Sequence, residues 1–178
     1  MDPRILAKRK MRKEKNRLER VKLAQNLTLF VLFIFLVYFI INSYVFTVIK
    51  VEGRSMYPTF DSGDKLLFSK INIRAESLDR GSVVVFKDGD SNRYIKRIVG
   101  LPGEYVEIRN GKIFINGELL KEEYNSQHTY KYNVDSWYLK DDEFFVLGDN
   151  RRQNDSKDSR IFGPINIKRI DGKFMFKL

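Results

Sequence analysis

The stretch Tyr105-Val106-Glu107-Ile108-Arg109-Asn110-Gly111-Lys112-Ile113-Phe114-Ile115-Asn116-Gly117 indicates the fold class of most of the chain. Apolar and polar residues alternate on both sides of Asn110-Gly111, which is the pattern of a strand with one buried face. Asn-Gly is a preferred two-residue hairpin turn because both of its positions tolerate a positive φ. The stretch therefore predicts an antiparallel β-hairpin.

Further strand-like runs lie on both sides of this hairpin. They are short, rich in Val, Ile and Phe, and bounded by turn-forming residues, and they cover 83–86, 94–99, 143–147 and 172–178. Beyond residue 49, a helical pattern is suggested only for a turn near 71–78. We predict a mainly β domain over 50–178, built as an antiparallel β-sheet or a partly open barrel. Residues 125–138 form a long excursion to which the sequence assigns no function.

An apolar segment precedes this domain. Residues 27–41 are apolar on every helical face, and only Asn42 and Ser43 separate them from a second apolar run at 44–49. As one helix, 27–49 would be roughly 34 Å long, which is enough to cross a hydrocarbon layer of about 30 Å. We predict a transmembrane α-helix at 27–49. A cleaved signal peptide is disfavoured because no small-residue cleavage site follows, and a buried core helix because so small a domain could not cover it.

Positive charge is concentrated before the anchor. The formal net charge is +10, and residues 1–26 hold ten Lys and Arg residues against three acidic ones, or about +7. Because Lys and Arg are retained on the cytoplasmic side, we predict a basic cytoplasmic segment at 1–26 and an extracytoplasmic domain at 50–178 of a single-pass cell-membrane protein. The domain itself is nearly balanced in charge, so we predict no nucleic-acid partner.

The chain has no cysteine and one histidine, His128. The lack of cysteine excludes a thiol nucleophile and a Cys-based zinc site. A Ser-His-Asp triad would have to use His128, which lies in a polar stretch and is interpreted as a surface-loop residue. Residues 148–160 are rich in small polar side chains but lack the spacing of a calcium loop. We therefore predict no metal and no cofactor.

Gly53, Ser55 and Pro58 come soon after the apolar stretch. Glycine permits a tight backbone path and proline restrains the chain, so Ser55 could be presented on a rigid, exposed turn. Taken alone, the same pattern is typical of an ordinary turn.

Lys96 and Arg97 lie in the middle of the predicted strand 94–99. Neighbours on a strand point to opposite faces, so one of these cations must face the core, and the pattern alone does not decide which. Arginine stays protonated, whereas a desolvated lysine can lose its charge. A catalytic base in this strand would therefore be Lys96, and the alternative is an exposed strand lysine.

Several segments taken together resemble the sequence boxes of bacterial type I signal peptidases, in the short single-anchor form with a Ser/Lys dyad. They follow the anchor in the family's order: Ser-Met-Tyr-Pro-Thr at 55–59, Arg-Gly-Ser-Val-Val-Val-Phe at 80–86, Lys-Arg-Ile-Val-Gly-Leu-Pro-Gly at 96–103, Gly-Asp-Asn-Arg at 148–151 and Asp-Ser-Arg at 158–160. The resemblance covers most of the chain, and the combination of boxes is far more specific than any one of them.

The resemblance implies that Ser55 is the acylating nucleophile and Lys96 the general base, with the backbone amide of Ser55 in the oxyanion hole. It also implies supporting roles for other motif residues, namely Ser156 as a hydrogen-bond partner of the lysine, Asp158 and Arg160 as an ion pair, and Gly53, Met56, Pro58, Arg97, Asp149 and Asn150. The chain departs from the family in three places. Some relatives carry a serine oxyanion donor where Gly53 stands, an acidic residue often stands where Ser82 does, and about two extra residues precede Asp158.

The expected function is removal of signal peptides from exported preproteins, with cleavage after small residues at −1 and −3. Expected partners are membrane-tethered preproteins, the lipid bilayer and a secretion translocase nearby. Ser55 follows the apolar stretch by six residues, which limits its reach from the membrane to about 20 Å. Two alternatives are a Ser/Lys self-cleaving repressor-like domain and a membrane-anchored processing or assembly domain of the same fold, the latter specialised or catalytically silent.

Overall fold

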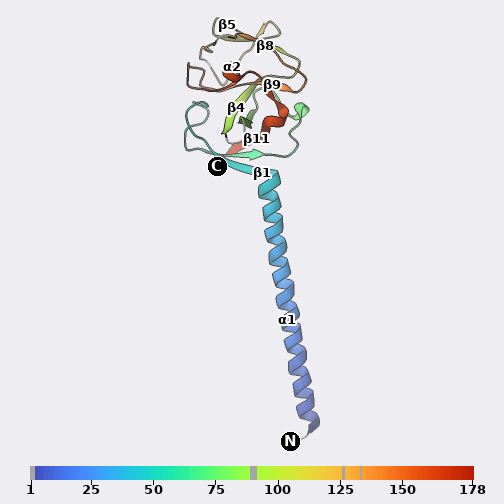
Figure 1. Ribbon diagram of the computed structural model, residues 1–178. Coiled ribbons are helices and arrows are strands. Elements are labelled where there is room, and N and C mark those ends of the chain that lie inside the picture. The colour runs from blue at the N-terminus through green and yellow to red at the C-terminus, as the bar shows by residue number, and fades with distance from the viewer. Residues whose placement is uncertain (1–2, 89–91, 126, 133) are drawn as a thin grey trace. The chain divides into compact units, whose positions relative to one another are not determined.

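The protein is described from a computed structural model that covers residues 3–88, 92–125, 127–132 and 134–178 (Figure 1). The chain divides into two compact units, Met1–Ser43 and Tyr44–Leu178.

The first unit is one long helix, α1 (Pro3–Ile40), followed by the π-helical turn η1 (Ile41–Val45), which runs into the second unit. Its segment Lys10–Ile40 is long and apolar enough to cross a membrane, with a mean hydropathy of 2.2 in its most apolar window. Phe46 to Ile49, which the sequence predicts as the end of the anchor, lie instead in strand β1 (Phe46–Lys50). Phe, Val and Ile favour strands as well as membranes, and pairing with a neighbouring strand satisfies their backbone groups.

The larger sheet of the second unit has seven described strands. Their order is β1, β2 (Lys65–Ser69), β11 (Ile170–Lys177), β3 (Val83–Asp88), β4 (Asn92–Gly100), β9 (Glu143–Leu147) and β10 (Ile165–Asn166). Each neighbouring pair is antiparallel. Strand β4 is an interior strand of this sheet, paired with β3 on one side and with β9 on the other.

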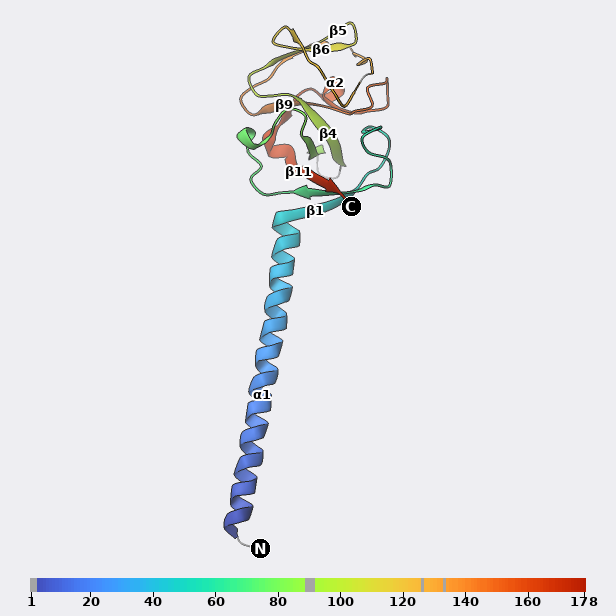
Figure 2. The same cartoon turned by 180° about the vertical axis from the view of Figure 1, so that it is seen from behind.

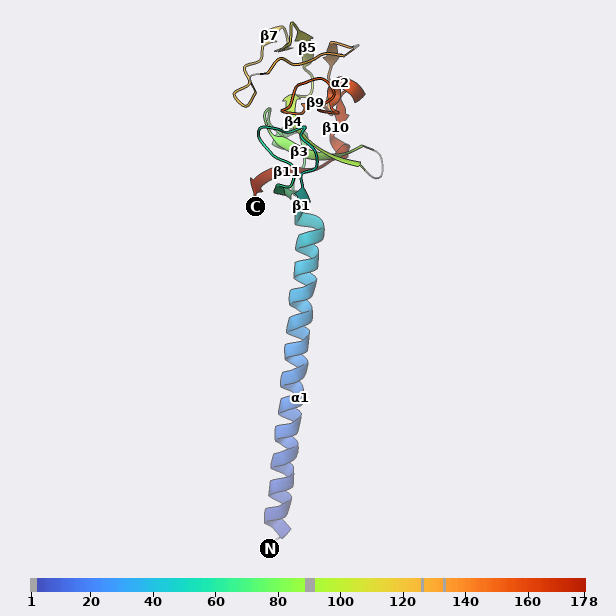
Figure 3. The same cartoon turned by 90° about the vertical axis from the view of Figure 1, so that its left-hand side faces the viewer.

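A smaller sheet lies at the opposite end of this unit from β1, as Figures 2 and 3 show. Its described strands, in order, are β7 (Glu118–Leu119), β6 (Lys112–Ile115), β5 (Tyr105–Arg109) and β8 (Ser136–Tyr138). The predicted hairpin is confirmed: Arg109 pairs with Lys112, and Asn110 and Gly111 have φ values of 50° and 72°.

Three short helices complete the described part of the unit: η2 (Ala75–Ser77), α2 (Ser159–Phe162) and η3 (Ile167–Arg169). The predicted mainly β, antiparallel fold behind an N-terminal apolar helix is confirmed. Over the residues described, neither sheet closes into a barrel.

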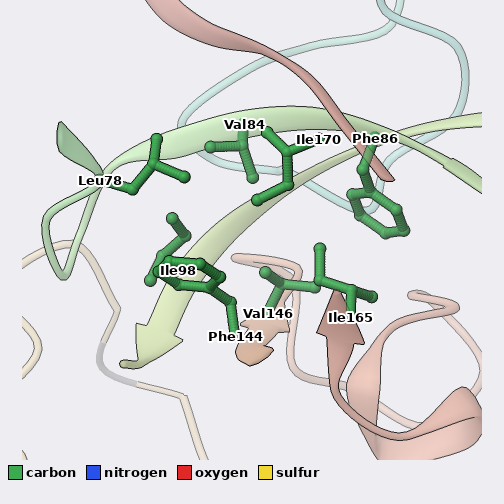
Figure 4. Packing of buried hydrophobic residues seen from close by; sticks show 8 residues of the cluster. All are labelled: Leu78, Val84, Phe86, Ile98, Phe144, Val146, Ile165 and Ile170. Carbon is green, nitrogen blue, oxygen red and sulfur yellow. The ribbon is translucent and has the colours of Figure 1, made fainter. Parts of the chain in front are cut away.

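The core is divided by the larger sheet. Val84, Phe86 and Ile98 belong to one buried cluster, shown in Figure 4, whereas Val83 and Val85 belong to another on the opposite face. A further cluster joins the smaller sheet to β4 and β9. Because β3 and β4 are buried on both faces, consecutive residues of β4 are both enclosed.

Candidate active site

The turn that follows β1 carries Ser55. Gly53 has a φ of 79°, a left-handed conformation that favours glycine, so a serine at this position would be strained. Met56 is buried in a hydrophobic cluster and accepts a backbone hydrogen bond from Phe60 at 3.0 Å, whereas Pro58 is exposed. The buried Met56 anchors the turn and leaves Ser55 half-exposed beside it.

Lys96 lies on β4 and points toward this turn. Its Nζ atom donates to Ser55 Oγ at 2.6 Å and to the Ile95 carbonyl oxygen at 2.9 Å. Only 2% of the residue is exposed. Within the described part of the chain, no carboxylate forms an ion pair with Lys96. The predicted pair Ser55 and Lys96 is therefore brought into direct hydrogen-bonding contact.

Burial lowers the pKa of Lys96 to about 8, because desolvation penalises the ammonium form. The carboxylates of Asp158 and Asp149 oppose this shift, and the guanidinium of Arg160 adds to it. With a pKa of about 8, roughly one lysine in ten is neutral at pH 7, against fewer than about one in a thousand at the ordinary value.

Arg97 is also buried, with 9% of the residue exposed. The strand pattern predicts that one of the two cations faces the core, and the structure encloses both because both faces of β4 are covered. Arg97 binds Asp149 through two nitrogens, at 2.9 and 2.6 Å, and donates to the Gly81 carbonyl at 2.8 Å. Thr59 adds a hydroxyl donor to the same carboxylate at 2.5 Å.

Asp158 and Arg160 form the ion pair that the resemblance implies, with both residues buried. Two guanidinium nitrogens of Arg160 donate to the two oxygens of Asp158, each at 2.8 Å. Ser156 was expected to bind the lysine, but its hydroxyl donates to Asp158 at 2.7 Å. The Lys96 amine bonds instead to Ser55 and Ile95, and the carboxylate next to Ser156 is the stronger acceptor for its hydroxyl.

The turn after β9 holds the backbone at Ser55. The backbone amide of Asn150 donates to the Ser55 carbonyl at 3.0 Å, and its side-chain amide donates to the Arg54 carbonyl at 3.2 Å. A methyl group at Gly148 would collide with the Ser55 carbonyl oxygen and the Ser156 hydroxyl, so only glycine permits this approach.

These contacts orient the peptide group between Arg54 and Ser55. Its carbonyl oxygen points to Asn150, so the trans amide directs the Ser55 N–H to the opposite side. Among the residues described, no group accepts a hydrogen bond from this N–H. The amide is therefore available to a ligand beside Ser55.

A groove of about 350 Å³ runs past Ser55 and Lys96, between residues 49–56 and residues 92–96 of β4. Strand β9 pairs with β4 from Arg97 onward, so along 92–96 the described sheet leaves that edge of β4 open. Ile98 bonds toward β3, through its N–H to Ser82 at 2.9 Å and its carbonyl to Gly81 at 2.8 Å. By alternation, Ile95 and Arg93 present their backbone groups to the groove.

The structure adds residues that sequence reasoning did not select. Glu122 binds Arg151, Tyr124 stacks on Arg97, and Thr59 joins the Asp149 site. Nothing local in the sequence marks Glu122 or Tyr124, although Thr59 and Arg151 lie within the quoted motifs. The exposed His128 packs on Gly111 of the β5–β6 turn, as expected of a loop residue. No cluster of potential metal ligands occurs in the described ranges.

Comparison with known proteins decides the family. The family described as signal peptidase, peptidase S26, matches residues 24–178. This chain belongs to that family. Signal peptidase IB of Staphylococcus aureus is 33% identical over 160 residues, which cover 80% of this chain and 83% of that protein. Signal peptidase I V of Bacillus subtilis (strain 168) is 37% identical over 145 residues, which cover 74% and 85%.

A crystal structure of a signal peptidase I from Enterococcus faecalis V583 aligns with a TM-score of 0.45 and 31% identity, over 55% of this chain and 96% of that chain. Membership in the signal peptidase S26 family implies a serine peptidase. Together with the apolar helix α1, it indicates a membrane-anchored protein.

Proposed function

We propose that this signal peptidase removes signal peptides from exported preproteins by an acyl-enzyme mechanism in which Ser55 is the nucleophile and Lys96 the general base. One observation carries the proposal: Lys96 Nζ lies 2.6 Å from Ser55 Oγ, and the amine is enclosed without a carboxylate partner among the described residues. A lysine in this setting can be neutral near physiological pH and accept the serine proton.

In the acylation step, Ser55 Oγ attacks the carbonyl carbon of the scissile peptide while its proton passes to Lys96 Nζ. The carbonyl oxygen becomes an oxyanion, which the free N–H of Ser55 is directed to bind. The C–N bond then breaks, the leaving amine takes the proton from Lys96, and the substrate acyl group remains on Ser55.

In the deacylation step, neutral Lys96 takes a proton from water as the water oxygen attacks the ester. The Ser55 oxygen leaves and receives that proton back from Lys96, which regenerates the free enzyme. A single amine therefore acts as base and acid in both halves of the reaction.

The substrate is expected to bind as an extended strand. The open edge of β4 presents the backbone groups of Ile95 and Arg93 to the groove, so a peptide can add to the sheet there by main-chain hydrogen bonds. A peptide seated so close to Val51, Met56 and Ile95 would place alternate side chains against apolar walls. This arrangement supports selection of small residues at −1 and −3.

The test uses detergent-solubilised full-length protein and a labelled preprotein with an Ala-x-Ala site. We expect Ser55→Ala and Lys96→Ala each to abolish cleavage, and the exposed controls Ser62→Ala and Lys140→Ala to retain it. Full activity of either dyad variant would overturn the mechanism. Preprotein binding without cleavage by the unaltered protein would favour the assembly-domain alternative.

The proposed orientation places residues 1–26 in the cytoplasm and the β domain outside, near the translocase. Because the chain has no cysteine, a single one can be introduced as Lys13→Cys or Lys140→Cys. A membrane-impermeant maleimide applied to intact cells should label Lys140→Cys alone. Labelling of Lys13→Cys alone would reverse the orientation.

A further inference from the structure

Glu122 and Tyr124, just before the long excursion at 125–138, and Thr129 within it contact two arginines that adjoin the turn after β9. Glu122 accepts from Arg151 through both of its carboxylate oxygens, one of them at 2.8 Å from Nη1. Thr129 accepts from the same Nη1 at 2.9 Å. The Arg151 side chain is completely buried, and that of Glu122 is 9% exposed. Glu122 therefore neutralises this buried arginine, and Thr129 supplies a further acceptor.

Arg151 in turn binds the turn after β9. Its Nε donates to the Gly148 carbonyl at 2.7 Å. The same turn reaches the nucleophile, because Gly148 packs against the Ser55 carbonyl and Asn150 binds the carbonyls of Ser55 and Arg54. A continuous set of contacts thus runs from Glu122 through Arg151 and the 148–150 turn to the peptide group that contains the Ser55 N–H.

Tyr124 contacts the arginine on the other side of the same turn. The Arg97 guanidinium lies 4.0 Å from the centre of the Tyr124 ring, and Arg97 holds Asp149 through two hydrogen bonds. Burial beside Glu122 raises the pKa of Tyr124, so its hydroxyl stays protonated. The residues on both sides of Asn150 are therefore linked to Glu122, Tyr124 and Thr129, Arg151 directly and Asp149 through Arg97.

We propose that Glu122 is a positioning residue for catalysis: through Arg151 it sets the placement of the 148–150 turn, and thereby the direction of the Ser55 N–H and the alignment of Ser55 with Lys96. The inference rests on the proposed nucleophilic role of Ser55. Glu122 does not touch the groove, so its effect should fall on the chemical step and not on substrate binding.

Loss of the Glu122 carboxylate is expected to displace the 148–150 turn because it leaves Arg151 without its partner. A buried guanidinium without its carboxylate is costly, and the side chain would move toward water or another acceptor. Either movement releases the Gly148 carbonyl and lets the turn shift. A displacement of about 1 Å at a reacting centre can reduce the rate by about 100-fold.

The first experiment compares Glu122→Gln with the matched control Glu123→Gln, an exposed neighbour, in full-length protein with the labelled preprotein. For Glu122→Gln we expect kcat to fall by about 10- to 100-fold, KM to stay within about twofold, and the apparent pKa of the rate to stay near 8, because Glu122 is not among the groups that shift Lys96. Circular dichroism measures the folded fraction of each variant at the assay temperature.

A Glu122→Gln variant that is folded and has kcat within about twofold of the unaltered protein would overturn the inference. So would a fall in rate that matches the fraction unfolded, which is the result expected of a purely structural residue. If Ser55→Ala is also active, the proposed function is contradicted. If Ser55→Ala is inactive and Glu122→Gln is fully active, only the positioning role of Glu122 is contradicted.

A milder variant keeps the test decisive if Glu122→Gln does not fold. Thr129→Val removes the neutral hydroxyl acceptor of Arg151 with little change in shape. We expect its kcat to fall by about three- to tenfold with KM unchanged. An unchanged kcat in this variant, with Glu122→Gln unfolded, would contradict the proposal.

Discussion

Lys96 and Arg97 are consecutive residues of β4, and both are nearly enclosed. They differ in their hydrogen-bond partners. Arg97 is held by two hydrogen bonds from a buried carboxylate, whereas the amine of Lys96 meets a hydroxyl and a carbonyl. A paired cation keeps its charge and serves as a scaffold. An enclosed cation without such a partner gives up its proton more readily, and this difference is what the proposed mechanism requires of Lys96.

The difference between Lys96 and Arg97 depends on which groups the nearby Asp158 and Asp149 carboxylates bind. Asp158 raises the pKa of Lys96 more than any other group does, yet its two oxygens bind Arg160, Ser156 and the Gly148 amide. Asp149 is likewise bound to Arg97. Both carboxylates that raise the pKa of Lys96 are thus paired with an arginine, and their combined effect is smaller than that of desolvation.

The largest effect is expected when Lys96 is replaced by arginine, the residue type of its neighbour Arg97. Lys96→Arg keeps a positive charge that cannot be lost near neutral pH, so we expect cleavage to fall by roughly 10⁴-fold, equivalent to about 5.5 kcal/mol in the barrier. The measurement is single-turnover cleavage of the preprotein. Lys87→Arg, at an exposed position near the end of β3, is the control, and more than a tenth of normal activity in Lys96→Arg would contradict a proton-accepting role.

The next variant removes the partner that distinguishes Arg97. Asp149→Asn leaves a buried guanidinium without its carboxylate, and we expect the free energy of unfolding to fall by about 3–5 kcal/mol. Chemical denaturation in detergent measures it, with the exposed Asp155→Asn in the same loop as control. A loss below about 1 kcal/mol would mean that Arg97 finds another acceptor and that its pairing is not what separates it from Lys96.

The sequence predicts local features of the fold better than it predicts which residues a second layer covers. The β5–β6 hairpin is encoded within thirteen residues by alternation and Asn-Gly, and it forms as expected. Strand alternation places Lys96 and Arg97 on opposite faces but says nothing about a second covering layer, so the burial of both was not predictable. The sequence pattern also extends the apolar helix too far, to residue 49, because Phe46–Ile49 suit a strand as well as a membrane.

The sequence predicts the site residues that lie in short local motifs. It does not predict partners that are distant in the chain. The Ser55 and Lys96 boxes are short, and their contact follows once β4 passes the turn after β1. Glu122 meets Arg151 from 29 residues away, and no pattern around Glu122 signals a buried acid. The Ser156 hydroxyl was misassigned because a choice between Lys96 and Asp158 depends on angles that sequence spacing does not contain.

A third variant tests whether enclosing Lys96 is costly. A lysine whose pKa is lowered from 10.5 to about 8 on folding destabilises the folded state below about pH 8, and the cost disappears as pH rises through 10.5. We expect Lys96→Met to raise the free energy of unfolding by up to about 3 kcal/mol at pH 7 and to lose that advantage near pH 10.5. A pH-independent difference between the two proteins would show that the lysine is not desolvated.

The smallest effect needs no mutation. If the neutral amine of Lys96 is the reactive form, the rate should follow the deprotonated fraction of a group whose pKa is about 8. The fraction rises from roughly one tenth at pH 7 to nine tenths at pH 9, so single-turnover cleavage should increase by about tenfold over that interval and then level off.

Asp158→Asn sharpens the assignment: removal of the carboxylate that most raises the Lys96 pKa should move the midpoint to lower pH, whereas a midpoint that belongs to the substrate would stay in place. An unmoved midpoint in a folded Asp158→Asn variant would mean that the titrating group is not Lys96, because loss of the Asp158 charge must lower the pKa of this amine.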